Sequence, residues 1–408
     1  MNTDASIAGA AAAGDRRQYL ISLTVLTTLF FMWGAITSLN DILLPHLKTA
    51  FDLDYTQATL IQFTFFTAYF LVSLPAGWIV QRIGYKRGII AGLTAAAVGC
   101  LLFLPAASLR VYGVFLGALF VLASGITLLQ VSANPYVAII GPPATAPARL
   151  NQTQAFNSLG TTVAPYIGAT LILGAATAGG SGLAGVAAVK MPYLGLAVTL
   201  VLIAGLVAAI RLPAVAPATA AGQAIGGIGG RRPLLLGAVA IFLYVGGEVS
   251  IGSFLVSYLS EPEIGGLAAA AAGKYLSYYW GGAMVGRFIG AAVLTRLDAG
   301  RVLAFHALVA MALVTVSLLS AGPTAMWSML AVGLFNSIMF PTIFTLGIKG
   351  LGEYTARGSG LLCMAIVGGA LVPLAQGHLA DRIGLHASFI VPALCYLYIV
   401  YYGVKGSA

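Results

Sequence analysis

The sequence predicts an all-α membrane protein of twelve transmembrane helices, arranged as two pseudo-symmetric bundles of six. Three observations lead to this prediction. Of the 408 residues, 60% are hydrophobic and 8% are charged, whereas soluble domains are about 25% charged. Twelve apolar runs are long enough to cross a bilayer, and one flexible interval divides them into six and six. This composition excludes a soluble enzyme, a disordered chain, a disulfide scaffold and a nucleic-acid-binding module.

The membrane spans follow from hydropathy, because about 20 apolar residues cross a bilayer as one helix. Each run is bounded by glycine, proline or charge, and none alternates like a strand of a membrane barrel. We expect spans at 19–45, 56–81, 88–107, 111–139, 150–174, 192–211, 233–259, 268–296, 301–320, 324–348, 357–379 and 385–404. Residues 1–18 then form a short polar tail, and the first span is not a cleaved signal because eleven more spans follow.

The two halves of the chain share a design. Residues 19–211 and 233–404 each hold six spans, and the Pro-, Ala- and Gly-rich interval 212–232 links them. Three landmarks recur 206 or 208 residues apart, namely Pro135 with Pro341, Arg149 with Arg357, and Gly160 with Gly368. Repeated six-span halves are typical of transporters that open a midplane site to each side in turn.

Lysine and arginine predict the orientation, because they are enriched in cytoplasmic loops. With the N-terminus inside, fifteen basic residues fall on the inner side and five on the outer side. Both termini are therefore expected in the cytoplasm. The net charge of +9 then reflects membrane topology and does not indicate a nucleic-acid partner.

The loop between the second and third spans combines glycines with cations. It holds Gly77, Arg82, Gly84, Lys86 and Arg87. A tight turn needs glycine, and clustered cations keep the loop in the cytoplasm. The loop resembles the signature loop of the major facilitator superfamily, although Gln81 replaces the usual aspartate. We interpret it as a cytoplasmic gating loop.

Two acidic residues fall inside predicted spans, Asp41 and Glu248. A charge in hydrocarbon costs roughly 2.5–3.5 kcal/mol, so such residues face a bundle interior or a water-filled cavity. An acid in that environment can take up and release a proton, and we predict that both residues couple transport to a cation. Asp41 as a carboxylate hydrated from outside, and Glu248 as a structural acid between helices, remain alternatives. Sodium is an alternative to the proton, with Asn40 and Ser250 among its oxygen ligands.

Polar side chains form a stripe on each of two neighbouring spans. They repeat at helical spacing as Ser124, Thr127, Gln130 and Asn134, and as Asn151, Gln154, Asn157 and Thr161. Amides and hydroxyls both donate and accept hydrogen bonds, so such stripes suit an uncharged, polyhydroxylated ligand. The alternative is hydrogen bonding between helices, worth about 0.6 kcal/mol a pair.

The second half adds an aromatic and an amide candidate. Trp280 lies well inside the eighth span and is a candidate pocket wall, whereas Tyr275 belongs to the interfacial belt. Asn336 precedes Pro341, whose missing N–H is expected to kink the tenth span. Either ligand binding or packing would explain Asn336. Cys100, Cys363 and Cys395 all lie within spans and show no metal-ligand spacing.

Six segments together resemble the fucose permease family of the major facilitator superfamily. They are FFMWG at 30–34, LNDIL at 39–43, LQVSANPY at 129–136, AFNSLG at 155–160, GEVSIGSF at 247–254 and LFNSIMFPT at 334–342. The resemblance implies the major facilitator fold and a sugar:cation symporter of the bacterial inner membrane. The span-4 and span-7 segments look more like the branch that transports glucose, galactose and N-acetylglucosamine than like the fucose transporters.

The resemblance also implies roles for individual residues. Asp41 matches the family's proton-coupling aspartate, and the amides that contact sugar in the fifth span fall on Gln154 and Asn157. A functionally essential glutamate of the fucose permeases falls on Gln130, which can bind sugar but cannot titrate. Any proton relay in this chain must therefore be shorter or use Glu248.

We therefore predict a monomeric secondary active importer of a neutral monosaccharide, driven by a proton or sodium gradient and free of cofactors. The sugar would contact Asn40, Gln130, Asn134, Gln154, Asn157, Trp280 and Asn336. An uncoupled facilitator and an exporter are alternatives within transport. An integral membrane transferase is disfavoured because no paired acids or nucleophile motif occur, and a sugar sensor would need a signalling domain.

Overall fold

The computed structural model describes residues 16–38, 55–109, 111–168, 183–210, 212–213 and 230–407. Within these ranges every regular element is a helix. The first half comprises a helix at Arg16–Ser38, α2 at Tyr55–Ile83, α3 at Tyr85–Leu109, α4 at Tyr112–Ile139, α5 at Ala146–Gly168 and α7 at Leu183–Ala209. Each coincides with one predicted span of the first half. Most of the predicted linker lies outside the described residues.

The second half comprises six spans, three of them divided. Three are single helices: α8 at Arg232–Ser260, α9 at Ala269–Val293 and α10 at Ala299–Leu319. The tenth span is α11 (Gly322–Asn336) and α12 (Met339–Ile348). The eleventh is α13 (Thr355–Met364), a 3-10 turn (Ala365–Val367) and α14 (Gly368–Ile383). The twelfth is α15 (Leu385–Ser388), α16 (Ile390–Tyr401) and a π turn (Tyr402–Gly406).

The break in the tenth span has a chemical cause at Pro341. Proline has no N–H, so the carbonyl of Ser337 one turn earlier lacks its usual helical donor. Arg287 of α9 fills this vacancy, because its Nε donates to the Ser337 carbonyl oxygen at 3.1 Å. The predicted kink is thus confirmed as a break between Asn336 and Met339. A cationic side chain from another helix caps it.

Length and apolar character mark ten of the described helical segments as able to cross a membrane. The two full-length helices outside this group are α5 and α9. Their polar and charged residues include Asn151 and Gln154 on α5 and Arg287 on α9. They also pack against each other across the molecule. The two full-length helices outside the apolar group therefore face one another.

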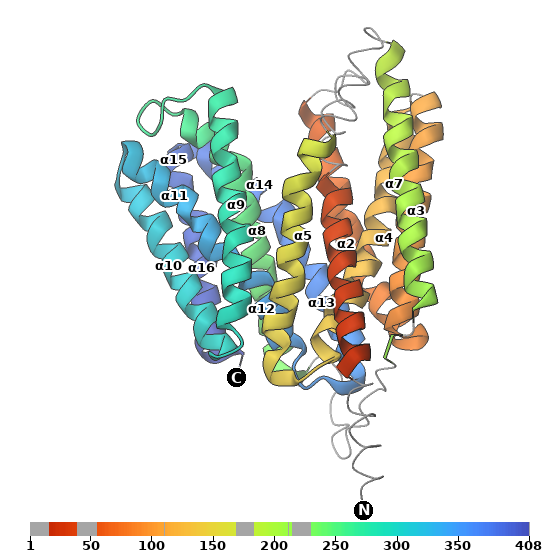
Figure 1. Ribbon diagram of the computed structural model, residues 1–408. Helices are drawn as coiled ribbons and strands as arrows, with labels where there is room; N and C mark the ends of the chain where they lie inside the picture. The colour runs from red at the N-terminus through yellow and green to blue at the C-terminus, as the bar shows by residue number, and fades with distance from the viewer. Residues whose placement is uncertain are drawn as a thin grey trace, which may run out of the picture.

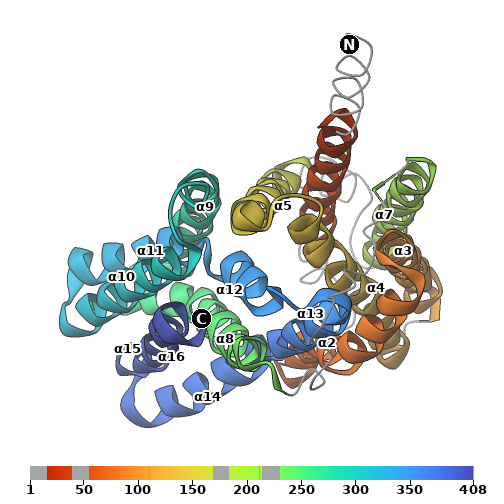
Figure 2. The same cartoon turned by 90° about the horizontal axis from the view of Figure 1, so that it is seen from below.

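The helices form two bundles, one from each half of the chain (Figure 1). Within the first bundle α4 packs on α2 and α3, and α3 packs on α7. Within the second bundle α11 lies between α9 and α10, and α8 packs on α14 and α16. Seen from below, α12 and α13 lie at the centre beside α5 and α4 of the other bundle (Figure 2).

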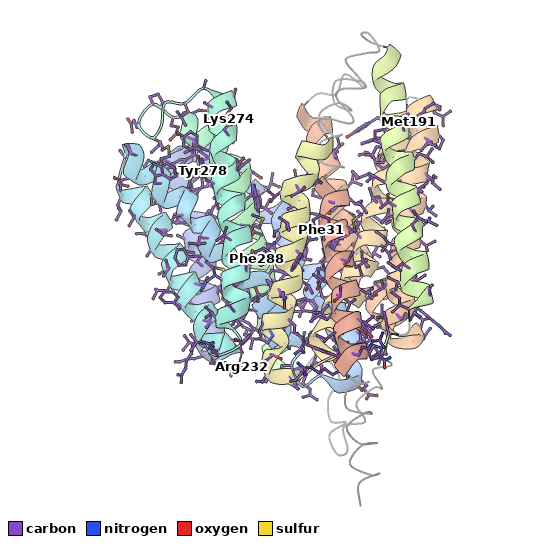
Figure 3. The ribbon with its side chains drawn as sticks, viewed as in Figure 1. Phe31, Met191, Arg232, Lys274, Tyr278 and Phe288 are labelled. Carbon is purple, nitrogen blue, oxygen red and sulfur yellow. The ribbon has the colours of Figure 1, made fainter. Side chains whose placement is uncertain are left out.

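The bundles meet at one end of the molecule, which we call the basic end. It carries Arg82, Arg149, Arg232, Lys349 and Arg357 next to the helix termini, and Figure 3 shows Arg232 there and Lys274 at the opposite end. Among the described residues, four recorded hydrogen bonds join the bundles, pairing Gln81 with Glu353, Asn151 with Thr342, Ser158 with Arg287 and Val131 with Ser359. They lie at the basic end or near the middle of their helices, and α5 and α9 diverge towards the opposite end (Figure 1).

Candidate functional site

The first bundle contains a cluster of amides built by α2, α4 and α5. Gln130 Nε2 donates to the Tyr69 hydroxyl at 2.7 Å, and Gln154 Nε2 donates to Asn134 Oδ1 at 3.4 Å. Gln130 Oε1 and Asn134 Nδ2 are buried and have no hydrogen-bond partner. Buried polar atoms are normally paired, so this acceptor and this donor, one turn apart on α4, are available to hydrogen-bond a ligand. Three predicted sugar contacts, Gln130, Asn134 and Gln154, are therefore brought together.

The stripe on α5 divides into residues with different neighbours. Asn151 Nδ2 donates to Pro147 O at 2.9 Å and to Thr342 Oγ1 of the other bundle at 3.2 Å. Asn157 Nδ2 donates to Phe30 O of the first helix at 2.9 Å. The Asn157 amide, which was predicted to contact sugar, thus joins α5 to the first helix. Its role as a sugar contact stays a prediction.

The second bundle contains a hydrogen-bonded network around Glu248. The Tyr244 hydroxyl donates to Glu248 Oε1 at 2.7 Å, and the Tyr279 hydroxyl donates to the Glu248 carbonyl at 3.4 Å. Asn336 Nδ2 in turn donates to the Tyr279 hydroxyl at 2.7 Å. The network connects the predicted coupling acid Glu248 to the predicted sugar contact Asn336. Neither tyrosine was among the predicted site residues, although Tyr244 lies one helical turn from Glu248 on the same face.

Arg287 connects this network to the other bundle. It interacts electrostatically with Glu248, and its Nε donates to the Ser337 carbonyl oxygen. Its NH1 also forms a short contact with Ser158 Oγ of α5. Next to it, Phe288 and Phe156 pack edge to face at 5.5 Å between ring centres, and Figure 3 shows Phe288 where α9 faces α5. One guanidinium therefore contacts the broken tenth span and the facing bundle, and its charge acts on the predicted coupling acid.

Trp280 lies one turn from the Glu248 network, towards the end opposite the basic end. Its ring rests against Gly252 of α8 and packs edge to face on Tyr279 at 5.0 Å between ring centres. The side chain is 41% exposed, so an accessible ring stands beside the network. Its role as a pocket wall stays a prediction.

Asp41 and Asn40 lie outside the described residues. The first helix is described up to Ser38, whose Oγ donates to the Thr161 carbonyl of α5 at 3.0 Å. The coupling role of Asp41 and the sugar contact of Asn40 remain predictions from the sequence.

The predicted gating loop is shorter than expected, because Gly77 and Arg82 lie in α2 and Lys86 and Arg87 lie in α3, which leaves Gly84 as the turn between them. Gly84 adopts a φ of 82°, which other residues rarely tolerate. Lys86 Nζ donates to the Ala208 and Ile210 carbonyls at 2.8 Å each and so caps the end of α7, while Arg82 and Arg87 are exposed. Gln81, which replaces the aspartate of the resembling loops, reaches the other bundle and donates to the Glu353 carbonyl at 3.3 Å.

A metal site is not indicated by the described part of the chain, where no cluster of three histidine, cysteine or acidic side chains occurs. The three cysteines are free and buried.

Comparison with known proteins identifies the family. Residues 24–366 match the model of the Major Facilitator Superfamily. The chain belongs to the major facilitator superfamily. Two bundles of six helices are the fold of this superfamily, and its members that resemble this chain are transporters, not enzymes.

Two relatives and one solved structure match nearly the whole chain. A glucose/galactose transporter of Brucella abortus is 58% identical over 396 residues, which cover 96% of each chain. The L-fucose-proton symporter of Escherichia coli is 35% identical and covers 95% of this chain and 93% of its own. The crystal structure of FucP, a superfamily transporter in the outward conformation, superposes with a TM-score of 0.87 at 34% identity and covers 95% of this chain and 98% of its own.

Proposed function

We propose that this protein is a secondary active importer that carries a neutral hexose, glucose or galactose, together with a cation. The observation that carries the proposal is the 58% identity to a glucose/galactose transporter over 96% of both chains. N-acetylglucosamine is a further candidate from the sequence resemblance. The amide cluster supports a neutral cargo, because Gln130, Asn134 and Gln154 supply donors and acceptors without a fixed charge.

The coupling ion is proposed to be the proton. The L-fucose-proton symporter of E. coli is 35% identical to this chain, which favours a proton over sodium. Glu248 is the described acid placed for this role, because Tyr244 donates to it and the charge of Arg287 acts on it. Uptake of a proton by Glu248 would remove its attraction for Arg287, which in turn contacts the other bundle. Asp41 would act as the second coupling acid.

The orientation proposed from the basic loops places the basic end and both termini in the cytoplasm of a bacterial inner membrane. The hydrogen bonds between the bundles then close the cytoplasmic side, and the site opens outward. The similarity to FucP in the outward conformation supports this assignment. Labelling of an introduced cysteine at Arg87 in intact cells by a membrane-impermeant maleimide tests the orientation. Reaction without lysis would reverse it.

We propose a monomer, which light scattering of the purified protein tests.

Uptake into proteoliposomes tests the function. Labelled glucose, galactose, N-acetylglucosamine and fucose are offered singly, under an imposed proton gradient, a sodium gradient or neither. Accumulation of glucose or galactose above the external concentration, under the proton gradient alone, is the expected result. Equilibration without accumulation under any gradient would identify a facilitator. Absence of uptake of all four sugars would refute sugar transport.

A further inference from the structure

Helices α2 and α13 approach each other closely where the bundles meet at the basic end. A Cβ on Gly77 of α2 would come within 2.9 Å of the Ala356 carbonyl and 3.1 Å of Arg357 Cα. One turn away, a Cβ on Gly360 of α13 would lie 2.6 Å from the Ser73 carbonyl. The two backbones are thus packed directly on each other, and any opening of the basic end must separate them.

Arg357 lies at this contact between two aromatic rings. Its guanidinium carbon is 5.6 Å from the centre of the Trp78 ring on α2 and 5.9 Å from the centre of the Tyr354 ring beside α13. Trp78 belongs to the first bundle and Tyr354 to the second. Both distances lie within the range of a cation–π interaction, for which tryptophan is the best ring. Arg357 Nε is buried and has no hydrogen-bond partner.

The equivalent arginine of the other half behaves differently. Arg149 is 4% exposed and donates to the carbonyls of Val137, Ala138 and Pro142 and to Thr145 Oγ1. All these acceptors belong to its own bundle, so Arg149 fixes the join of α4 and α5. In the part of the chain that the structure describes, no such hydrogen bond is recorded for Arg357. The two arginines at equivalent positions of the repeat therefore have different contacts. Arg149 joins helices of its own bundle, and Arg357 contacts Trp78 of the other bundle.

We propose that Arg357 and Trp78 form a cation–π latch that holds the basic end closed, and that Arg357 is a positioning residue of the transport cycle. The ring of Tyr354 keeps the guanidinium in place when Trp78 withdraws, so the latch can close again. The proposal concerns the balance between the two states of the transporter and does not depend on which solute is carried. Gln81 also joins the bundles at this end, because its uncharged amide donates to the Glu353 carbonyl. Gln81 carries no charge that would compete with Trp78 for the Arg357 guanidinium.

The distance between spin labels at the opposite end tests the latch without any substrate. Met191 of α7 is 73% exposed, Lys274 of α9 is exposed, and Figure 3 shows both at the end opposite the basic end, one on each bundle. Labels on cysteines introduced at these positions report how far that end is open, because the native cysteines are buried. Opening of the basic end closes this end and shortens the distance.

In the Trp78→Leu variant, we expect the ratio of the short-distance population to the long-distance population to rise about twofold to fivefold. This change corresponds to the free energy of an exposed cation–π interaction. Trp78→Phe keeps an aromatic face and should shift the populations less. Trp327→Leu is the matched control, because Trp327 is similarly exposed at 48% but packs on Tyr275 and Tyr278 of its own bundle.

Arg357→Gln should shift the populations in the same direction as Trp78→Leu, and Arg357→Lys, which keeps a cation, less than Arg357→Gln. The two Arg357 variants therefore test the latch independently if Trp78→Leu does not fold. Equal shifts in the leucine and phenylalanine variants, or no shift beyond that of Trp327→Leu, would overturn the latch. A failure of sugar uptake in the wild type would leave these distances unaffected, so the two proposals fail separately.

Discussion

Replacing Gln154 by methionine is expected to weaken sugar binding about tenfold or more while leaving the fold intact. Methionine keeps the length of the side chain and removes its hydrogen-bonding groups. The hydrogen bond from Gln154 Nε2 to Asn134 is long, at 3.4 Å, and contributes little to folding. A tenfold loss of affinity corresponds to about 1.4 kcal/mol, the size of one good hydrogen bond to the sugar.

The matched variant is Asn157→Leu, one turn along the same stripe of α5. The Asn157 amide donates to the Phe30 carbonyl at 2.9 Å. Because that carbonyl lies within a helix and keeps its helical donor, the loss should be near the net value of one hydrogen bond, about 1 kcal/mol of unfolding free energy. Any loss of sugar affinity would come in addition.

Calorimetric titration of purified protein with galactose and glucose measures the binding, and thermal unfolding measures the stability. We expect Gln154→Met to lose affinity at an unchanged unfolding temperature, and Asn157→Leu to unfold at a lower temperature. Unchanged affinity in Gln154→Met would remove the amide cluster from the sugar site. Equal loss of affinity in both variants at unchanged stability would show that Asn157 contacts sugar and contributes little to packing.

Three further predictions concern coupling and helix capping. Asp41→Asn should abolish accumulation of sugar against its gradient in proteoliposomes while preserving exchange; full accumulation would exclude Asp41 from coupling. Glu248→Gln keeps an oxygen that accepts from Tyr244 but cannot titrate, so uptake should no longer respond to the pH gradient, and an unchanged response would make Glu248 structural. Lys86→Met removes two hydrogen bonds from the end of α7 and should cost about 1 kcal/mol of stability, discounted for partial exposure; an unchanged thermal midpoint would show that water replaces the ammonium group.

Local features of the sequence predict much of the architecture. A bilayer offers no partner to an unpaired backbone group, so an apolar run of sufficient length must become a helix. For this reason the predicted spans coincide with helices of the described chain, and Pro341 marks the break in the tenth span. The turn at Gly84 follows in the same way, because few other residues tolerate its φ.

The partners of the polar residues could not be predicted in this way. The stripe on α5 reads as one uniform feature, yet Asn151 faces the other bundle, Gln154 joins the amide cluster, and Asn157 holds the first helix. Helical periodicity defines which residues share a face, but what that face meets depends on helices far away in the chain. Arg287 falls inside the expected span 268–296, and no local pattern in the sequence indicates its contacts with Ser337 and Ser158.

The two arginines of the repeat show the division most clearly. From the sequence, Arg149 and Arg357 are equivalent, since each precedes the corresponding span of its half. In the structure, one is buried among carbonyls of its own bundle and the other lies against a tryptophan of the facing bundle. Hydropathy and charge in the sequence alone determined the twelve-span transporter architecture and the expected orientation, because each span meets the bilayer through its own residues. Tertiary structure alone decided which polar groups form the amide cluster, the Glu248 network and the latch, because those contacts join side chains that only the packing of the two bundles brings together.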